Sequence, residues 1–497
     1  MLESLRKRTG AAKLQHPLIL SIIIIATIIV GAVVAKGGLK VAIALVFLAP
    51  AVYFLNRLFN NPVVGIYSVL FMAFTAIGLT RYIHNVPLGL SIDGLMVLMV
   101  VAIFFKYLSD GIDFTLLRRD IVYLMLIWFG YSVMEFFNPA ALSRTAWFYA
   151  MRGVSLYPLL LIPIALLIFS KLKHLYGFLV FWAIFSLLAS LKGLQQRYIG
   201  LDAGEQYWLD TVGAITHIIN GKLRIFSFFS DAGQFGAAQG AAGIVFAGVA
   251  ASLKGTGKKL FFWIVSLASF WGMFLSGTRG AIIVPALGGI TFVILSKRPR
   301  IIIMGGMALA FIYIFFAYTY IGDSSYTIAR MRTAFHPETD ASYLVRLQNR
   351  QILATYLADK PFGGGIGSAG NWGQRFSPQG FLANVATDSW YVQIWAEQGR
   401  VGLLLHLFIL MYIMFKSFYL IMAKVKSKEL GNILGALLGG YIGIIGASYG
   451  NGVLGQMPTG ILLYLSWVFM FSAQALQREY DSRIERGLPA WSLKSFD

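Results

Sequence analysis

The sequence predicts an all-α polytopic membrane protein with about 14 transmembrane helices (12–14), and three observations carry this prediction. Of the 497 residues, 58% are hydrophobic and only 12% are charged, about half of the roughly 25% that soluble proteins carry. The mean hydropathy is +0.72. The apolar residues form runs of about 20, which is the length of a helix that crosses a bilayer. We therefore expect residues 1–497 to form a single integral membrane domain.

The apolar runs follow one another along the chain and are separated by short polar or basic segments. Spans are expected to begin near Pro17, Leu39, Pro62, Leu88, Asp120, Val154, His174, Asp231, Leu260, Ala281, Ile301, Gln398, Leu430 and Pro458.

Two polar interruptions are expected to be loops outside the lipid. Residues 195–230 contain an amphipathic segment from Tyr198 to Lys222, which predicts a helix lying in the membrane interface. A plain amphipathic packing helix is the alternative. Residues 322–388 carry five arginines. Helix-compatible stretches at 328–333 and 344–356, ahead of the breaker Pro361, predict a large and partly helical loop.

Short basic clusters predict the orientation of the chain. With a cytoplasmic N-terminus, nearly every short basic cluster falls on the cytoplasmic side, as the positive-inside rule requires. These clusters are residues 6–13, 118–119, 171–173, 254–259, 297–300, 424–428 and 478–486. Both termini are then cytoplasmic, and both polar loops lie on the outer face. The net charge of +20 is accounted for largely by this membrane topology, and no nucleic-acid partner is expected.

A set of arginines remains on the outer side, where the insertion bias works against them. A guanidinium presents a planar fork of donors that matches pairs of phosphate oxygens. The set therefore predicts an anionic ligand at the membrane surface, and a lipid-linked pyrophosphate fits. For any one arginine the alternative is a lipid headgroup contact or an internal ion pair. The set includes Arg81, Arg144, Arg152, Arg197, Arg224, Arg279, Arg330, Arg332, Arg346, Arg350, Arg375 and Arg400.

Other chemistries find little support in the sequence. The chain has no cysteine, which excludes disulfides, thiolate metal sites and a cysteine nucleophile. No His, Asp or Glu residues have metal-ligand spacing, so no metal site and no cofactor are expected. The glycine run at residues 363–365 lacks the lysine of a nucleotide-binding loop and is read as tight backbone turns.

Three polar stretches share an external position beside predicted spans. They are Arg224-Ile-Phe-Ser-Phe-Phe-Ser-Asp231-Ala-Gly-Gln234; Ser276-Gly-Thr-Arg279-Gly-Ala; and a longer one from Asp340-Ala-Ser342 and Arg346 through Pro361-Phe-Gly-Gly-Gly to Asp388-Ser389 and Gly399-Arg-Val-Gly402. In order and spacing, over roughly residues 222–410, they resemble the O-antigen ligase and polymerase superfamily of bacterial membrane glycosyltransferases.

The resemblance implies a GT-C-like helical architecture in the bacterial inner membrane, with a periplasmic active site. It implies transfer of a glycan from undecaprenyl pyrophosphate to an acceptor glycan or glycolipid. We expect an inverting, metal-independent polymerase that extends a polysaccharide such as O-antigen. One alternative is an O-antigen ligase that transfers to lipid A-core, and another is a lipid-linked oligosaccharide flippase. A flippase would place charge at mid-membrane and often shows two related halves, neither of which the sequence displays.

The resemblance also assigns residues. Arg279 and Arg346 take the places of the arginines held to engage the pyrophosphate. The family's histidine, nine residues before the Gly-x-x-Gly pair, is replaced by Asp388, which would then act as the base. This departure puts the ligase assignment in doubt and favours a polymerase. The alternative role for Asp388 is to cap the helix that begins near Trp390.

Further substrate-binding candidates come from the same loops. His336 is the substitute base, and Trp372 is assigned either to glycan stacking or to packing of the loop. The others are Arg152, Arg224, Asp231, Gln234 and Arg350.

Overall fold

The computed structural model describes residues 17–83, 86–219, 221–296, 299–324, 326–336 and 341–492. The chain divides into two compact units, Met1–Val64 and Gly65–Asp497. The regular structure in the described ranges is helical, apart from one antiparallel hairpin of β1 (Ile218–Ile219) and β2 (Lys222–Leu223).

The first unit contains α3 (Pro17–Asn60), which breaks at Gly38 with φ 63° and ψ −159°. Glycine adopts this left-handed region at little cost. The two halves of α3 correspond to the spans predicted to begin near Pro17 and Leu39. The predicted basic cluster at 6–13 lies outside the described residues.

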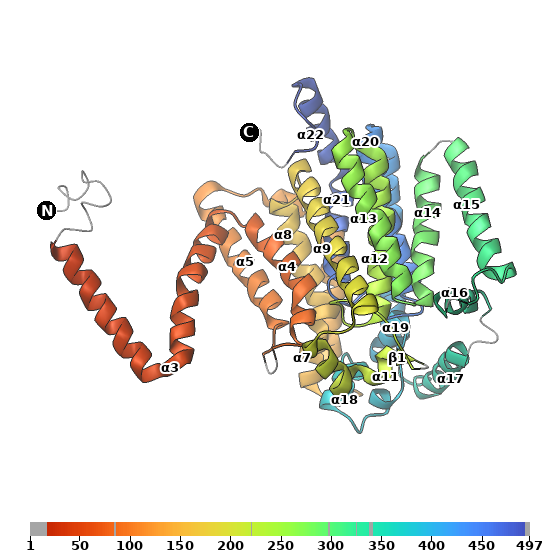
Figure 1. The fold of residues 1–497 in the computed structure, drawn as a ribbon, viewed down its shortest axis with the longest axis horizontal. Helices are drawn as coiled ribbons and strands as arrows, with labels where there is room; N and C mark the ends of the chain where they lie inside the picture. Colours follow the sequence, from red (N-terminus) through yellow and green to blue (C-terminus); the bar gives the residue numbers. More distant parts are fainter. Residues whose placement is uncertain are drawn as a thin grey trace. The chain divides into compact units, whose positions relative to one another are not determined.

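The remaining helices follow in sequence order (Figure 1). The longer ones are α4 (Val63–Leu79), α5 (Leu90–Asp110), α6 (Asp120–Met134), α8 (Tyr157–Ile168), α9 (Leu172–Tyr198), α12 (Ala232–Ser252), α13 (Thr256–Leu275), α14 (Ile283–Ser296), α15 (Pro299–Tyr318), α17 (Ala341–Tyr356), α19 (Trp390–Lys424), α20 (Lys428–Ala447), α21 (Thr459–Phe471) and α22 (Ala473–Glu485). The shorter ones are α7 (Arg144–Met151), α10 (Ala203–Trp208), α11 (Ala214–His217), α16 (Tyr326–Arg332) and α18 (Gly370–Phe376).

Eight helical segments in the described ranges are long and apolar enough to cross a membrane, and α21 with α22, bent by 66°, would make a ninth. Four shorter apolar helices, among them α4 and the segment Arg279–Leu295, cover other predicted spans. The protein is therefore an all-α polytopic membrane protein, as predicted. The count of about 14 spans stays a prediction.

The small-residue helix α12 lies at the centre of the second unit and packs against α13 and α20 (Figure 1). Most of its side chains are buried. A Cβ added at Gly248 would lie 2.5 Å from the Cβ of Ala436, and one added at Gly243 would lie 2.6 Å from the ring of Phe270. Small residues allow helices to approach this closely in membrane proteins. The close packing fixes the N-terminus of α12, where the polar stretch of residues 224–234 ends.

The basic turns meet at one end of the helices, which we call the basic end. Four of the basic turns donate a hydrogen bond of 2.8 to 3.0 Å to the C-terminal segment 471–491. The donors are Arg119, Leu172, Lys258 and Lys426. The clusters around these residues therefore share one end, as predicted. The opposite ends of α12, α13 and α20 carry the arginine-rich stretches, and we call this the polar end (Figure 1).

The amphipathic segment after Tyr198 differs from its prediction. Instead of one interfacial helix it forms α10, a π-helical turn, α11 and the β hairpin. Asp202 begins α10 through a capping box with Glu205. Leu209 is buried while Val212 is 69% exposed.

The backbone of residues 361–365 packs directly against the backbone of α19 around Gly399. Gly399 breaks α19 with φ 66°, and a Cβ there would lie 2.0 Å from the carbonyl oxygen of Pro361. Gly364 and Gly365 donate their N–H groups to the carbonyls of Ala396 and Glu397 at 2.9 and 2.8 Å. The glycine run thus forms tight backbone turns, as predicted. The span expected near Gln398 instead begins at Trp390, because the polar residues before the break are already helical.

Candidate active site

Two adjoining cavities open at the polar end. The larger has a volume of about 460 Å³ and is lined by Arg224, Thr278, Arg279, Gly280, Ile282, Ile283, Ala286, Arg330, Thr333, Phe335, Tyr343, Arg346, Gly446, Ala447, Tyr449, Gly450 and Asn451. The smaller, of about 210 Å³, is lined by Arg224, Asp231, Gln234, Arg346, Asp388, Gly450, Asn451, Gly452, Val453 and Gln456. The wall that they share consists of Arg224, Arg346, Gly450 and Asn451.

The larger cavity is strongly positive on one side and apolar on the other. Among the described residues, its lining contains four arginines and no carboxylate. Its apolar wall comes from Ile282, just before α14, from Ile283 and Ala286 at the start of α14, and from Phe335. A cavity of this composition suits an anion that carries a hydrocarbon chain, because each part finds a matching wall.

Threonine hydroxyls position two of the arginines. Arg224 donates from Nη2 to Thr278 Oγ1 at 2.9 Å, and Thr278 Oγ1 in turn donates to the carbonyl of Ala232 at 2.8 Å. Arg279 donates from Nη1 to Thr333 Oγ1 at 3.1 Å. Arg224 is therefore connected through Thr278 to the first turn of α12, and Arg279 is connected to the turn that follows α16.

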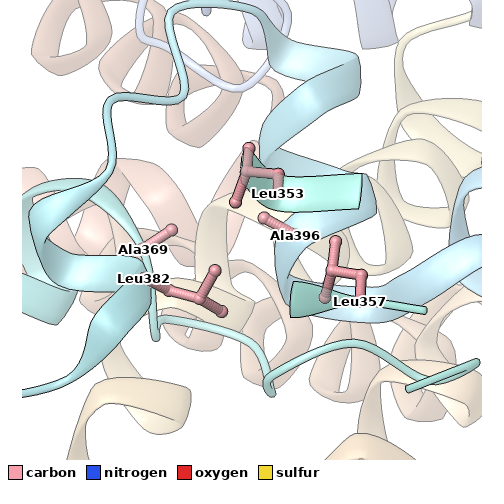
Figure 2. Close-up of a cluster of buried hydrophobic side chains, with 5 residues drawn as sticks. All are labelled: Leu353, Leu357, Ala369, Leu382 and Ala396. Atoms are coloured by element: carbon pink, nitrogen blue, oxygen red, sulfur yellow. The ribbon is translucent and has the colours of Figure 1, made fainter. Parts of the chain in front are cut away.

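The third arginine, Arg346, comes from α17, and the pattern of that helix explains its direction. Residues 346, 350, 353 and 357 recur at spacings of four, three and four, which places them on one helix face. The last two, Leu353 and Leu357, are buried in a cluster with Ala369, Leu382 and Ala396 (Figure 2). Packing of the C-terminal half of α17 therefore turns its two arginines toward the protein.

Arg350 lies beside the larger cavity rather than in its lining. It donates from Nη1 to the hydroxyl of Tyr449 at 2.7 Å, and its guanidinium carbon lies 4.6 Å from the centre of that ring. Tyr449 belongs to the cavity wall. Arg350 thus joins α17 to the loop between α20 and α21.

Asp388 lies in the smaller cavity, with its Oδ2 3.4 Å from the Nε of Arg346. Its side chain is 48% exposed. The helix α19 has Ser389 as its N-cap, without a capping hydrogen bond from a side chain. The hydroxyl of Ser389 donates to the carbonyl of Ser448 at 3.2 Å. The capping role considered for Asp388 is therefore absent from the structure.

Asp231 and Gln234 both line the smaller cavity, and the side chains of both make hydrogen bonds within the protein. Asp231 caps α12 by accepting from the N–H of Gln234 at 2.9 Å, and it also accepts from the hydroxyl of Ser230. Gln234 is fully buried. Its amide nitrogen donates to the carbonyl of Met457, and its oxygen accepts from Ser230 at 2.8 Å. Gln234 therefore positions the loop that precedes α21.

Besides Arg350, three predicted residues lie outside both cavity linings. Arg152 forms an ion pair with Asp93 at 2.8 Å, with its side chain 12% exposed. Trp372 stacks on Tyr149 with ring centres 5.2 Å apart; it also packs beside a small buried cluster, which favours the loop-packing reading. His336 is exposed after the 3-10 turn that ends α16.

The structure adds residues that the sequence interpretation did not select. Arg330 had been grouped with the external arginines, and it proves to line the larger cavity. Tyr449, Asn451 and Gln456 come from the loop between α20 and α21. The available signal was a run of polar side chains among glycines at 449–456, between two apolar stretches.

No group of three or more His, Asp or Glu residues in the described part of the chain could hold a metal ion. The charged side chains of the described residues that line the two cavities are guanidiniums and carboxylates.

These features define a polytopic membrane protein with an arginine-lined, half-apolar cavity at one end. Residues 264–407 match the family model described as O-Antigen ligase, which confirms, for this part of the chain, the predicted resemblance to the O-antigen ligase and polymerase superfamily. The match contains Arg279, Arg330, Arg346 and Asp388, but ends before Asn451. It implies an enzyme of the ligase or glycosyltransferase type. No curated protein sequence matches the chain.

Proposed function

We propose that the protein is a glycosyltransferase of the bacterial inner membrane that uses a glycan linked to undecaprenyl pyrophosphate and joins it to a saccharide acceptor at the periplasmic face. The observation that carries the proposal is the larger cavity, in which four arginines face an apolar wall and no carboxylate of the described residues lines the space. A diphosphate needs several charge-assisted hydrogen bonds, and a polyprenyl chain needs an apolar surface. Both requirements meet in this one cavity.

The position of the cavities also supports this donor. They lie at the polar end, opposite the basic turns, and the positive-inside rule assigns basic turns to the cytoplasm. A donor whose lipid remains in the membrane would then present its diphosphate at the level of Arg279 and Arg346. The long helices and the large segment between α15 and α19 are compatible with a GT-C-like architecture.

In the proposed reaction, the acceptor hydroxyl oxygen attacks the anomeric carbon of the donor sugar. The new carbon–oxygen bond forms as the bond between that carbon and the diphosphate oxygen breaks, and the diphosphate leaves with the electron pair. Asp388 accepts the proton of the hydroxyl. Arg279, Arg330 and Arg346 stabilise the charge that grows on the departing diphosphate. One displacement inverts the configuration at the anomeric carbon.

We favour a polymerase over a ligase because Asp388 stands where the ligases of the family carry histidine. The alternative remains a ligase that transfers the glycan to lipid A-core. A flippase is disfavoured by the location of the charge, since the arginines of the larger cavity lie at helix ends and in the connecting segments. The product distinguishes the first two, because a polymerase returns longer lipid-linked glycans.

The test is glycan transfer by the purified protein in lipid nanodiscs, with a labelled undecaprenyl-pyrophosphate glycan as both donor and acceptor. Each charge-assisted hydrogen bond contributes about 1.5–3 kcal/mol, so Arg279→Ala and Arg346→Ala should each lower kcat/KM by about ten- to a hundredfold. Lysine should not restore the rate, since it lacks the planar fork. The matched control is Arg197→Ala, at an exposed arginine in the last turn of α9.

Transfer at the wild-type rate by both alanine variants would refute the proposed site. Retention of the donor's anomeric configuration in the product would exclude the single displacement. Lipid-linked glycan that moves between leaflets without any transfer product would favour the flippase.

A further inference from the structure

The smaller cavity has a composition that the larger one does not explain. Apart from Val453 and backbone at the glycines, its lining consists of polar side chains: two guanidiniums, two carboxylates and three carboxamides. It contains no aromatic side chain and lacks the apolar wall of its neighbour. A small and almost wholly polar cavity suits a ligand with many hydroxyl groups, because each hydroxyl both donates and accepts a hydrogen bond.

Asn451 lies where the two cavities meet. Its backbone N–H donates to the carbonyl of Ala447 at 3.1 Å, which fixes the residue just beyond α20. A Cβ added at Gly280 would lie 2.6 Å from its Nδ2, and one added at Gly233 would lie 3.0 Å from its Oδ1. These two glycines thus leave room for the carboxamide, which makes no side-chain hydrogen bond with any residue that the structure describes.

Gln456 lies in the lining of the smaller cavity and is absent from that of the larger one. Its Oε1 accepts a hydrogen bond of 3.3 Å from Ser230. The same hydroxyl lies 2.9 Å from Asp231 and 2.8 Å from Gln234, so its single proton is shared among three acceptor oxygens. The oxygen of Gln456 therefore faces Ser230, while its amide nitrogen makes no hydrogen bond with a residue in the described ranges.

We propose that the smaller cavity binds the first sugar of the donor, and that the carboxamides of Asn451 and Gln456 recognise its hydroxyl groups. This inference rests on the proposed function, in which the diphosphate occupies the larger cavity. The first sugar is bonded directly to the diphosphate, so its site must adjoin the diphosphate site. The shared wall of Arg224 and Arg346 meets this requirement.

The volume of the smaller cavity limits what it holds. At about 210 Å³ it is below the roughly 300–1,000 Å³ of pockets for drug-sized ligands, so it accommodates one sugar ring rather than a longer glycan. Asp388 belongs to the same lining, which places the proposed base beside the anomeric carbon. Asn451 and Gln456 would then set which first sugar is accepted, and the rest of the glycan would extend outside.

The test compares two ligands for each variant in nanodiscs: undecaprenyl pyrophosphate alone, and the same lipid carrying one sugar. Gln456→Leu removes the carboxamide at similar volume. It should weaken binding of the sugar-bearing lipid about tenfold and leave binding of the bare lipid diphosphate within about twofold. Gln456→Glu exchanges the amide donor for an acceptor. It should likewise weaken binding of the sugar-bearing lipid and leave binding of the bare lipid diphosphate nearly unchanged. The matched control is Gln206→Leu, since Gln206 is exposed and bonded to Asp210 at 2.8 Å.

Equal weakening of both ligands by Gln456→Leu and Gln456→Glu, or no weakening of either, would overturn the sugar site. Arg279→Ala separates this failure from failure of the proposed function, because it should weaken binding of the bare lipid diphosphate. If it does so while both Gln456 variants bind the sugar-bearing lipid normally, only the sugar site is wrong. If Arg279→Ala leaves the bare lipid bound as before, the diphosphate site itself is wrong, and the sugar site is refuted with it.

Discussion

Arg81 offers the sharpest test of how the polar end is held together. The sequence places it among the external arginines that could bind an anion, but the structure buries it, with 2% of its surface exposed. Its guanidinium donates to the carbonyls of Ser227 and Phe229, the first at 2.6 Å. It also lies 4.7 Å from the ring of Trp208 and 4.4 Å from that of Phe226. Burial lowers the pKa of Arg81 to about 10, which leaves it charged at neutral pH.

The cost of replacing Arg81 follows from these contacts. A hydrogen bond from a charged donor contributes about 1.5–3 kcal/mol, and a desolvated cation–π contact about 2 kcal/mol. The single ammonium of Arg81→Lys can keep one carbonyl and part of one ring contact, so the variant should lose about 3 kcal/mol. With an entropy of unfolding of about 2 cal/mol/K per residue, this lowers Tm by about 3 °C. Arg81→Met satisfies neither carbonyl and should lose about 5 kcal/mol.

The assay is thermal unfolding in detergent, followed by tryptophan fluorescence, together with binding of undecaprenyl pyrophosphate. Arg224 and Asp231 flank the tethered residues 227–229, so both stability and affinity should fall. Arg197→Lys, at an exposed site, is the control. A variant Arg81→Lys that unfolds at the wild-type temperature would refute this reasoning. If that variant lost only the ligand, Arg81 would be a ligand-binding arginine after all.

Three further predictions concern the backbone, the base and the response to acid. Gly399→Ala should abolish the folded protein, because its Cβ would meet the carbonyl oxygen of Pro361 at 2.0 Å. The control is Gly370→Ala, which has φ 59° and open space around it and should lose only about 1–2 kcal/mol of stability. Equal yields of the two folded variants in size-exclusion chromatography would contradict the prediction for Gly399. Asp388→Asn should unfold at the wild-type temperature but transfer glycan at least about a hundredfold more slowly, and near-normal transfer would remove the base. Burial opposes ionisation of Asp202, but hydrogen bonds from its partners prevail and hold its pKa below the usual 3.8. The ionised carboxylate therefore stabilises the fold fully above that pH, and the stabilisation is lost as the pH falls below it. The decline of Tm in acid should accordingly be shallower in Asp202→Asn.

The sequence predicted the helices well, because runs of about 20 apolar residues have few other stable arrangements. It also predicted the separation of the basic turns from the arginine-rich stretches, since insertion bias depends only on local charge. The amphipathic segment after Tyr198 was harder. Its period is helical, but the capping box at Asp202 and the turn at Gly221 divide it into short elements.

The sequence alone does not distinguish an arginine that binds ligand from one that is paired within the protein. Arg81, Arg152 and Arg346 look alike in the sequence, because each lies outside a span and against the insertion bias. They are distinguished by partners distant in the chain: backbone carbonyls at 227 and 229 for the first, and Asp93 for the second. Arg346 was selected through the resemblance, and it lies on the face of α17 that leads to the buried Leu353 and Leu357.

The position of Arg346 links the two halves of the proposed reaction. It lines both cavities, and its Nε lies 3.4 Å from the Oδ2 of Asp388. A guanidinium carries five N–H donors in a rigid fork, so one edge can orient the carboxylate while the other binds the diphosphate. The group that stabilises the leaving diphosphate would then also fix the distance from the base to the anomeric carbon. A carboxylate at this position can pair with the arginine that the proposed diphosphate site uses, and the pairing orients the carboxylate.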